Sequence, residues 1–344
     1  MVLKQNVGID VSKDDFEANF SVIDNQFEKT KRGSRKFTND ENGFMKLFSW
    51  SEKLKEQGLK VSFTIEFTGV YYERLGYFLR SKEKTVHMVI PSKSKKYCES
   101  LSIASKTDKL DAQSLSWLGL ERNLREWDPI SDVFLDLRTL TREREELLKE
   151  RTMINNRKHA MGLKAKEQPK TMSRYGERLD LIASQIIEIE IEIKKLLQQD
   201  QKLWDRVCTI RTIPGVALIT TATVLAETNG FAAILNQKQL TSYAGLDVKL
   251  NESGKFKGKS KISKQGNAHI RRVLHFPAQT AIVHNKPIHV FFERVNATKI
   301  KPMIASVGVQ RKLLCMIFAI WKSNKSFDPN YEINKYGEMM KEVG

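Results

Sequence analysis

The feature that most constrains the fold is a pair of acidic residues within, or at the end of, apolar runs. Asp10 interrupts the run Val7-Gly8-Ile9-Asp10-Val11, and Glu66 ends the run Val61-Ser62-Phe63-Thr64-Ile65-Glu66. Short apolar runs of this length are typical of buried strands. A carboxylate in such a position is costly unless it is paired or binds a cation. The chain must therefore adopt a fold that gives these two acids a partner or an ion.

The first part of the chain alternates between strand and helix patterns. Three strand patterns come first, followed by helix, strand, helix, strand and helix. Residues 38–41 offer N-cap chemistry for the first helix, and Pro91 stops the last strand before a basic loop. The expected strands are about 5–11, 16–23, 26–37, 60–66 and 86–90, and the expected helices are about 41–57, 71–80 and 107–122. This order, with acids on the first strand, the fourth strand and the last helix, is the layout of a ribonuclease H fold.

Two further acids, Asp108 and Asp111, lie three residues apart at the start of the last expected helix. Taken alone, they are explained by a solvated first turn, where carboxylates complement the helix dipole. Together with Asp10 and Glu66 they form an oxygen-only ligand set. Such a set suits Mg²⁺, with Mn²⁺ as the alternative, and paired divalent ions suit phosphodiester chemistry. We predict a metal site made by these acids in an enzyme that acts on nucleic acid.

The charge of the chain points to a polyanionic partner. With 58 Lys and Arg against 41 Asp and Glu, the net charge is +17, and neutralising phosphates releases condensed counterions. A membrane surface is the competing interpretation, but the apolar run Leu313–Trp321 is too short to cross a bilayer. Cys98, Cys208 and Cys315 are far apart, which argues against a disulfide framework or a cysteine zinc site. We expect a cytoplasmic protein with no membrane partner.

The middle of the chain, about 131–165 and 172–204, is charged and helical, and Pro169 divides it. We predict an antiparallel helical hairpin or coiled coil that joins two domains. The alternatives that it also joins two subunits, or that it is an arm within one subunit, remain open because heptads do not identify a partner. The heptad positions are Leu179, Ile182, Ile186, Ile189, Ile193 and Leu196.

The last section, about 207–324, opens with Ile213-Pro214-Gly215-Val216 before a helical stretch. Such a turn is similar to a helix-hairpin-helix, whose backbone amides can bind a phosphate. Helices are expected at 268–284 and 309–321. Before and into the first of these helices, a basic loop from Lys249 to Arg272 that is rich in glycine favours nucleic-acid contact, although a charge run is usually a solvated face. The candidate nucleic-acid-binding residues are Lys249, Lys255, Lys257, Lys259, Lys261, Lys264, Arg271 and Arg272.

Within that loop, Ser253-Gly254 could present a hydroxyl on a turn. From the residues alone, a Ser-Gly turn is far more often structural than nucleophilic. No nearby His or Asp forms an evident triad with Ser253, so the spacing gives no argument for chemistry there.

The motifs resemble one family over nearly the whole chain. They resemble those of the DEDD-type insertion-sequence transposases, relatives of the Piv invertases that are now known as bridge-RNA-guided recombinases. The matching segments, in the family's order, are residues 8–13, 66–71, 106–112, 213–216, 243–246, 253–254 and 262–267 with Arg271-Arg272. One departure is Val216-Ala217, where the family commonly has glycine at the second position. The added methyl group puts phosphate binding at this turn in doubt.

The resemblance implies a RuvC-like α/β domain at 1–128, a helical coiled-coil linker at 129–205, a mostly α transposase domain at 206–326 and a tail at 327–344. It implies that Asp10, Glu66, Asp108 and Asp111 bind Mg²⁺. It also implies that Ser253 attacks the DNA phosphate to form a phosphoserine link. The implied partners are target and donor DNA, a non-coding guide RNA encoded by the element, and further copies of the chain, from dimer to tetramer, with composite active sites.

Two other functions remain open at this point. The first is a RuvC-like nuclease that hydrolyses branched DNA, in which Ser253 is structural. The second is a non-catalytic protein that binds RNA or DNA.

Overall fold

The computed structural model describes residues 1–67, 69–101, 107–166, 168–232, 234–249, 252–253, 256–257, 261–298 and 301–331, with backbone alone between 249 and 261. Contacts between residues divide the chain into two compact units, Met1–Pro129 and Ile130–Gly344. The first unit ends beside the expected domain boundary at residue 128. The second unit holds both the expected linker and the expected C-terminal domain, so the boundary at residue 205 stays a prediction.

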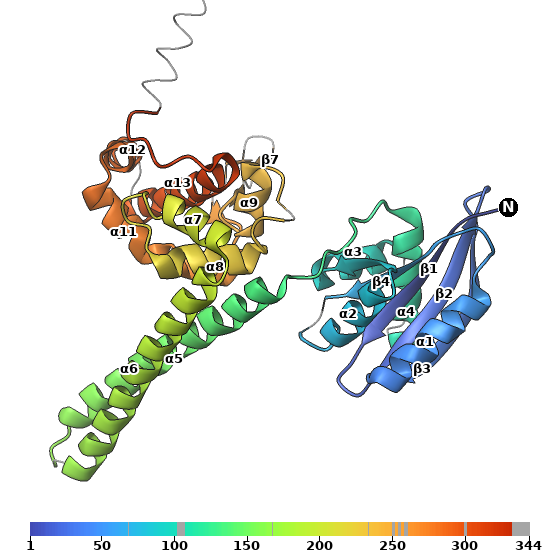
Figure 1. The fold of residues 1–344 in the computed structure, drawn as a ribbon, viewed down its shortest axis with the longest axis horizontal. Helices are drawn as coiled ribbons and strands as arrows, with labels where there is room; N and C mark the ends of the chain where they lie inside the picture. The colour runs from blue at the N-terminus through green and yellow to red at the C-terminus, as the bar shows by residue number, and fades with distance from the viewer. Residues whose placement is uncertain are drawn as a thin grey trace, which may run out of the picture. The chain divides into compact units, whose positions relative to one another are not determined.

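The first unit is a five-stranded sheet with helices on both faces (Figure 1). The strand order is β3-β2-β1-β4-β5, in which β1, β2 and β3 are antiparallel and β4 is parallel to both β1 and β5. The predicted α/β domain is therefore confirmed. Its elements are β1 (Val2–Val11), β2 (Asp15–Asp24), β3 (Lys29–Thr38), α1 (Glu41–Leu54), β4 (Val61–Glu66), α2 (Glu73–Ser81), β5 (Thr85–Val89), α3 (Pro91–Ser100) and α4 (Asp108–Glu121).

One face of this sheet carries the larger hydrophobic core. Phe16 of β2 stacks on Phe37 of β3, with ring centroids 5.5 Å apart, and meets Phe44 of α1 at 6.2 Å. Leu75 and Leu79 of α2 join the same cluster. Because alternate strand residues point to opposite faces, the residues on either side of Phe16 point away from this core.

Helix α4 covers the opposite face and lies close to β1. A Cβ on Gly8 would lie 2.1 Å from the carbonyl oxygen of Ala112 and 2.1 Å from the backbone nitrogen of Ser116. Asn6 Nδ2 donates to the Ser116 carbonyl at 2.9 Å, and Ser116 Oγ donates to the Asn6 carbonyl at 2.8 Å. Asn6 Nδ2 also donates to Thr64 Oγ1 of β4 at 3.0 Å. Glycine at position 8 thus permits a backbone approach that buried hydrogen bonds hold in place.

Helix α3 corrects the sequence prediction, which expected a basic loop after Pro91. Pro91 instead occupies the first turn of the helix, where its missing N–H costs nothing. Tyr97 is buried beside Leu115 and Leu118 of α4. The polar and basic composition of the segment conceals this narrow buried face. The expected loop residues 102–106 lie outside the described part of the chain.

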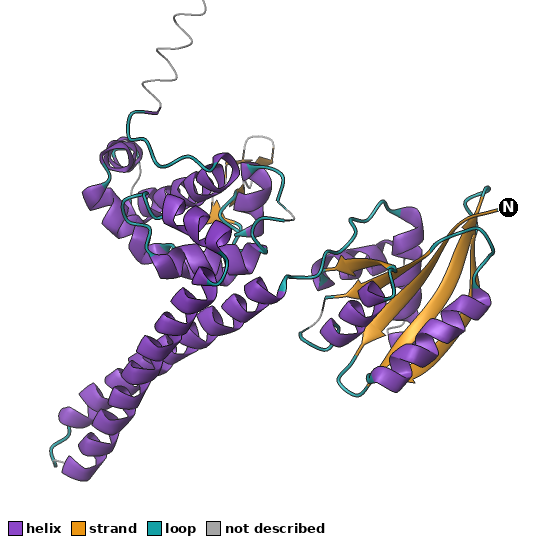
Figure 2. Ribbon diagram, in the orientation of Figure 1, coloured by secondary structure: helices purple, strands orange, loops and turns teal. Residues whose placement is uncertain are grey.

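The second unit is mostly helical, as predicted (Figure 2). Its small strands pair as two separate two-stranded sheets, β6 with β9 and β7 with β8. Its elements are α5 (Asp132–Gly162), α6 (Pro169–Gln198), α7 (Gln201–Ile210), α8 (Leu218–Thr228), α9 (Gln237–Tyr243), β6 (Val248–Lys249), β7 (Glu252–Ser253), β8 (Phe256–Lys257), β9 (Lys261–Ile262), α10 (Ala268–Val273), α11 (His275–His284), α12 (Lys286–Asn296) and α13 (Pro302–Ser323).

Helices α5 and α6 form the predicted antiparallel hairpin (Figure 1). Residues late in α5 pack against residues early in α6: Ile154 clusters with Ile182, whereas Arg144 lies 2.7 Å from Glu190. Pro169 is the first residue of α6, so the predicted division there is confirmed. The heptad residues Ile182, Ile186, Ile189 and Ile193 are buried. Supercoiling of the hairpin and any role between subunits stay predictions.

Several helix boundaries differ from those expected. The stretch expected to run to Trp204 breaks after Gln198, because Asp200 caps a new helix by accepting from the amides of Lys202 and Leu203. The stretch expected at 268–284 divides at Leu274 into α10 and α11. Helix α12 was not expected at all. The expected tail, 327–344, is described only as far as residue 331.

Helix α13 is longer than the apolar run that the sequence suggested. It spans 22 residues and is long and apolar enough to cross a bilayer by length and composition, so the argument that this segment is too short was wrong. However, half of its apolar window is buried within the protein. Val309, Leu313 and Ile317 lie fully buried in the core of the second unit. A core helix of this kind accounts for the composition.

Candidate active site

Asp10 and Glu66 lie side by side at one end of the sheet. The parallel register between β1 and β4 has Ile9 opposite Ile65 as its last pair, and Asp10 and Glu66 are the next residues on the two strands. Thr64, two residues before Glu66, contacts Asn6 on the α4 face. By the two-residue alternation of strands, Asp10 and Glu66 both belong to that face. The two acids therefore share one face at one end of the sheet.

The contacts between α4 and β1 place the first turn of α4 near Asp10. Asn6 contacts Ser116 and Gly8 contacts Ala112, so two residues forward on β1 correspond to four residues backward on α4. The two steps match in length, because two strand residues rise about 6.6 Å and four helical residues about 6 Å. One further step takes Asp10 to Asp108. The start of α4 thus brings its carboxylates to the same end of the sheet.

The helix start and one strand carboxylate are held by specific contacts. Thr107 caps α4, since its Oγ1 accepts from the Leu110 amide at 3.3 Å. The buried Ser94 of α3 donates from Oγ to Glu66 Oε2 at 2.5 Å. The sequence argument missed Ser94, because it assigned this segment to a loop. Asp108 is exposed, whereas Glu66 is partly buried.

The residue types and their common face fit a divalent cation with oxygen ligands. Their present spacing does not enclose one: within the described ranges, no three His, Cys, Asp or Glu side chains come close enough to hold a metal ion. The role of these carboxylates as ligands stays a prediction.

Ser253 lies at the tip of a small hairpin in the second unit. It is the last residue of β7 and pairs with Phe256 of β8. The intervening Gly254 and Lys255 lie outside the described residues, as does Lys259. The side chains of Ser253, Lys249, Lys257 and Lys261 are not described either, so their predicted roles are untested.

We call residues 244–267 the serine loop. Close backbone packing and hydrogen bonds hold the two ends of this loop together. Gly266 has a φ of +151°, and a Cβ there would lie 2.4 Å from the Tyr243 carbonyl oxygen. Only glycine fits this position. Arg271 Nη1 donates to the carbonyls of Ala244, Gly266 and Asn267 at 2.8, 3.2 and 3.2 Å. This candidate nucleic-acid ligand therefore joins the two ends of the serine loop within the folded unit.

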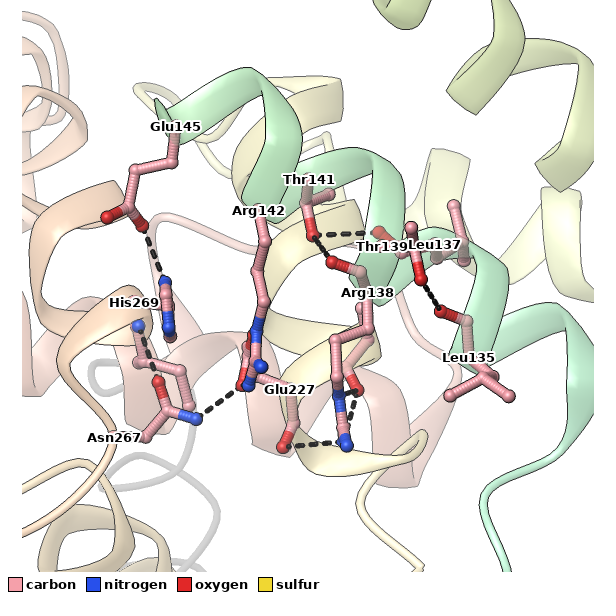
Figure 3. Close-up of polar contacts among 12 residues, drawn as sticks. Leu135, Leu137, Arg138, Thr139, Thr141, Arg142, Glu145, Glu227, Asn267 and His269 are labelled. Carbon is pink, nitrogen blue, oxygen red and sulfur yellow. Dashed lines mark hydrogen bonds and ion pairs between the residues drawn. The ribbon is translucent and has the colours of Figure 1, made fainter. Parts of the chain in front are cut away.

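A buried carboxylate, that of Glu227, links the end of the serine loop at Asn267 to helix α5 of the helical hairpin (Figure 3). Glu227, at the end of α8, has a side chain only 1% exposed. It accepts from Arg142 Nε and Nη2 of α5 at 2.8 and 3.0 Å, and from Asn267 Nδ2 at 2.5 Å. Burial alone would raise the pKa of Glu227, but the hydrogen bonds from Arg142 and Asn267 outweigh it and lower the pKa. Tyr243 Oη donates to the Glu227 carbonyl at 2.7 Å.

The two remaining candidate nucleic-acid-binding residues whose side chains are described, Lys264 and Arg272, differ in their contacts within the protein. Arg272 forms an ion pair with Glu145 of α5, which also lies 2.7 Å from His269 Nδ1. Lys264 is exposed and has a positive φ of 52°. Of the described candidates, Lys264 and Arg272 are both exposed, while Arg271 and Arg272 are held by partners within the protein.

The turn that is similar to a helix-hairpin-helix connects α7 to α8. Gly215 has a φ of +96°, and a Cβ on it would lie 2.9 Å from backbone atoms of Pro277 and Ala281 in α11. The exposed Ala217 occupies the N-cap position of α8 without a side-chain cap. Whether these amides bind phosphate stays untested.

Comparisons with known proteins agree along the chain. A family model described as "Transposase" matches residues 7–162, and a second, "Transposase IS116/IS110/IS902 family", matches residues 208–293. A "Pilin gene-inverting protein" of Moraxella bovis is 30% identical over 334 residues, or 94% of this chain and 98% of that protein. The "Transposase for insertion sequence element IS1111A" of Coxiella burnetii is 26% identical over 225 residues, or 58% of this chain and 60% of that protein.

Among solved structures, "T. thermophilus RuvC in complex with Holliday junction substrate" aligns with 36% of this chain and 99% of its own. The sequence identity is 8% and the TM-score is 0.26. This alignment is too weak to carry an argument.

Proposed function

The chain belongs to the IS110/IS116/IS902 family of transposases and is a DNA recombinase. We propose that it cuts and rejoins DNA through a covalent phosphoserine at Ser253. The proposed cation ligands are Asp10, Glu66, Asp108 and Asp111. The observation that supports this proposal best is the common position of Asp10 and Glu66, adjacent on one face of the sheet beside the first turn of α4.

In the proposed reaction, Ser253 Oγ attacks the phosphorus of a DNA phosphodiester. The Oγ–phosphorus bond forms as the bond from phosphorus to one deoxyribose oxygen breaks. Ser253 loses its proton, and the leaving deoxyribose oxygen gains one. An incoming DNA hydroxyl then reverses these steps on a new strand. Because the phosphoserine link keeps the energy of the phosphodiester, the strands can be rejoined without an external energy source.

The carboxylates of the first unit have a separate part in this proposal. They would hold Mg²⁺, or Mn²⁺, which supplies positive charge to the scissile phosphate and to the attacking and leaving oxygens. Ser94, through its contact with Glu66, fixes one of these carboxylates. The start of α4, capped by Thr107, carries two more.

The proposed partners are target and donor DNA, an element-encoded guide RNA and further copies of the chain. The net charge of +17 supports a nucleic-acid partner. The name of the Moraxella relative refers to the inversion of a pilin gene, and DNA inversion requires the same cutting and rejoining. Leu181, Ile187 and Ile191 of α6 are 58%, 60% and 50% exposed. These apolar side chains support the assembly of copies through the helical arm.

The test incubates the protein with labelled DNA, Mg²⁺ and RNA transcribed from the DNA that flanks its reading frame. We expect a protein–DNA adduct that survives denaturation and is absent with Ser253→Ala. Ser260→Ala, in the same loop, is the matched control and should keep the adduct. Asp10→Ala and Glu66→Ala should abolish cleavage but leave nucleic-acid binding largely intact.

The other outcomes separate the alternatives. Free nicked ends at full rate in Ser253→Ala would identify a hydrolytic nuclease that acts with water. Nucleic-acid binding without any strand cleavage would identify a non-catalytic binding protein. A loss of binding in Asp10→Ala equal to the loss of cleavage would mean that this acid stabilises the fold instead.

A further inference from the structure

Glu17 of β2 stands in the same row across the sheet as the proposed cation ligands. In the antiparallel register of β1 and β2, Asp10 is opposite Glu17. On the other side of β2, Glu17 is opposite Lys36 of β3. With Glu66 next to Asp10 on β4, the row reads Lys36, Glu17, Asp10, Glu66. Directly opposed residues in such a pair have Cβ atoms about 5 Å apart, so Glu17 is a neighbour of Asp10.

The side chain of Glu17 points to the α4 face of the sheet. Phe16, beside it, points into the core with Phe37 and Phe44, and alternate residues take opposite faces. Glu17 therefore shares its face with Asp10 and lies under the first turns of α4. Asp15, two residues earlier on the same face, accepts from Ser12 Oγ and pairs with Lys36 Nζ at 2.7 Å.

The side chain of Glu17 is buried, and one of its carboxylate oxygens lacks a hydrogen-bond partner among the described residues. The residue is 7% exposed, and its Oε2 is buried without a hydrogen-bond partner among the described residues. A buried carboxylate oxygen without a donor costs several kcal/mol in general. Asn19 Nδ2, on the same strand, is also without a partner, but it is a donor and cannot bind a cation. Glu17 Oε2 is an acceptor, so a cation can satisfy it.

We propose that Glu17 is a fifth carboxylate of the cation site, binding a divalent ion together with Asp10. This inference rests on the proposed cation site and adds a ligand on the β2 side of Asp10, opposite Glu66. A carboxylate on each side of Asp10 would let these acids hold a second divalent ion, and paired divalent ions suit phosphodiester chemistry. A bound ion would supply the partner that the buried Glu17 Oε2 lacks among the described residues.

The test measures Mn²⁺ binding by the full-length protein, from the electron paramagnetic resonance signal of free Mn²⁺, without DNA or RNA. Glu17→Gln keeps the shape of the side chain and removes its charge. We expect affinity for at least one Mn²⁺ to fall about tenfold or more, because loss of even an outer-shell partner of a metal ligand typically lowers metal affinity about 10–100-fold. Asp10→Asn is the positive control. Glu28→Gln, at an exposed glutamate of the same unit, should bind Mn²⁺ as the unaltered protein does.

Thermal unfolding separates a ligand from a structural residue. Without metal, Glu17→Gln should unfold at the same temperature as the unaltered protein or higher, because it removes one charge from a row of acids. With saturating Mn²⁺ or Mg²⁺, its increase in unfolding temperature should be smaller. Glu17→Asp, which keeps the charge on a shorter side chain, should recover part of the metal-induced increase.

Three results would overturn the proposal, and they can be told apart. If Glu17→Gln binds Mn²⁺ normally while Asp10→Asn does not, Glu17 is not a ligand and the cation site stands. If Glu17→Gln unfolds several degrees lower without metal and keeps the full metal response, Glu17 is structural. If the unaltered protein binds no Mn²⁺, the proposed cation site fails together with this inference.

Discussion

The replacement Gly8→Ala should displace α4 and with it the carboxylates that α4 carries. The new Cβ would lie 2.1 Å from backbone atoms of Ala112 and Ser116, against 3.4 Å or more for an ordinary contact. Helix α4 must therefore move by about 1.3 Å, which strains the buried hydrogen bonds between Asn6 and Ser116. Overpacking costs about 1–3 kcal/mol, and two weakened hydrogen bonds add about 1 kcal/mol each. We expect a loss of about 3–5 kcal/mol.

The assay combines denaturant unfolding of the first unit with Mn²⁺ binding. Gly33→Ala is the matched control, because a Cβ on this strand glycine would meet only the side-chain atoms of Leu54 and Trp50, at 3.1 Å. Gly8→Ala should lose both stability and Mn²⁺ affinity, whereas Gly33→Ala should lose little of either. Equal stabilities for the two variants would refute the close approach of α4. A large loss of stability with unchanged Mn²⁺ affinity would refute the link between helix position and the cation site.

Three further changes test other parts of the structure. Glu227→Gln should destabilise the second unit by about 2–3 kcal/mol, the value of hydrogen bonds to a charged group, as measured by hydrogen exchange of α8, whereas the exposed Glu143→Gln should not. The pKa of Glu227 is lowered from 4.5 in the folded protein, so its contribution to the free energy of unfolding is complete above about pH 4.5 and is lost as pH falls below that value. The free energy of unfolding of Glu227→Gln should therefore depend less on acid pH. An unchanged dependence would contradict the lowered pKa. Thr107→Ala should cost about 1 kcal/mol by removing the cap of α4, and thermal unfolding that matched the unaltered protein would show the cap to be unimportant. Replacing Leu181, Ile187 and Ile191 together by Gln should reduce the mass measured by light scattering to that of a monomer, whereas an unchanged mass would place the contact between copies elsewhere.

The sheet of the first unit could be predicted because its strands appear in the sequence as short apolar runs. Apolar runs around Asp10 and Glu66 gave both the order of the elements and the position of the acids. Helix α3 could not be found in this way, because few of its residues are buried and its composition is polar. Ser94, which donates to Glu66, was hidden with it. The two-residue strands β6 to β9 are too short to show any alternation.

Contacts that depend on strand register or on distant segments lay beyond a single sequence. Glu17 has the pattern of an ordinary strand residue, and only its pairing with Asp10 makes it a candidate. Glu227 ends an Ala- and Thr-rich helix, and its partner Arg142 lies 85 residues earlier. Arg271 was predicted to contact nucleic acid because it lies in a basic, glycine-rich stretch. That its guanidinium also donates to the carbonyl of Ala244, 27 residues earlier, is a contact that the sequence does not show.

The division into two units has a consequence for synthesis of the chain on the ribosome. The described hydrophobic clusters of the sheet unit use residues between Val2 and Trp127, and the cluster of the helical unit uses residues from Val133 onward. Since domains generally fold as units and in order of emergence, the sheet can close as soon as its own residues leave the exit tunnel. Asp10, Glu17 and Glu66 would thus be in place before Ser253 has been translated, and the proposed adduct with DNA could form only after the second unit is complete.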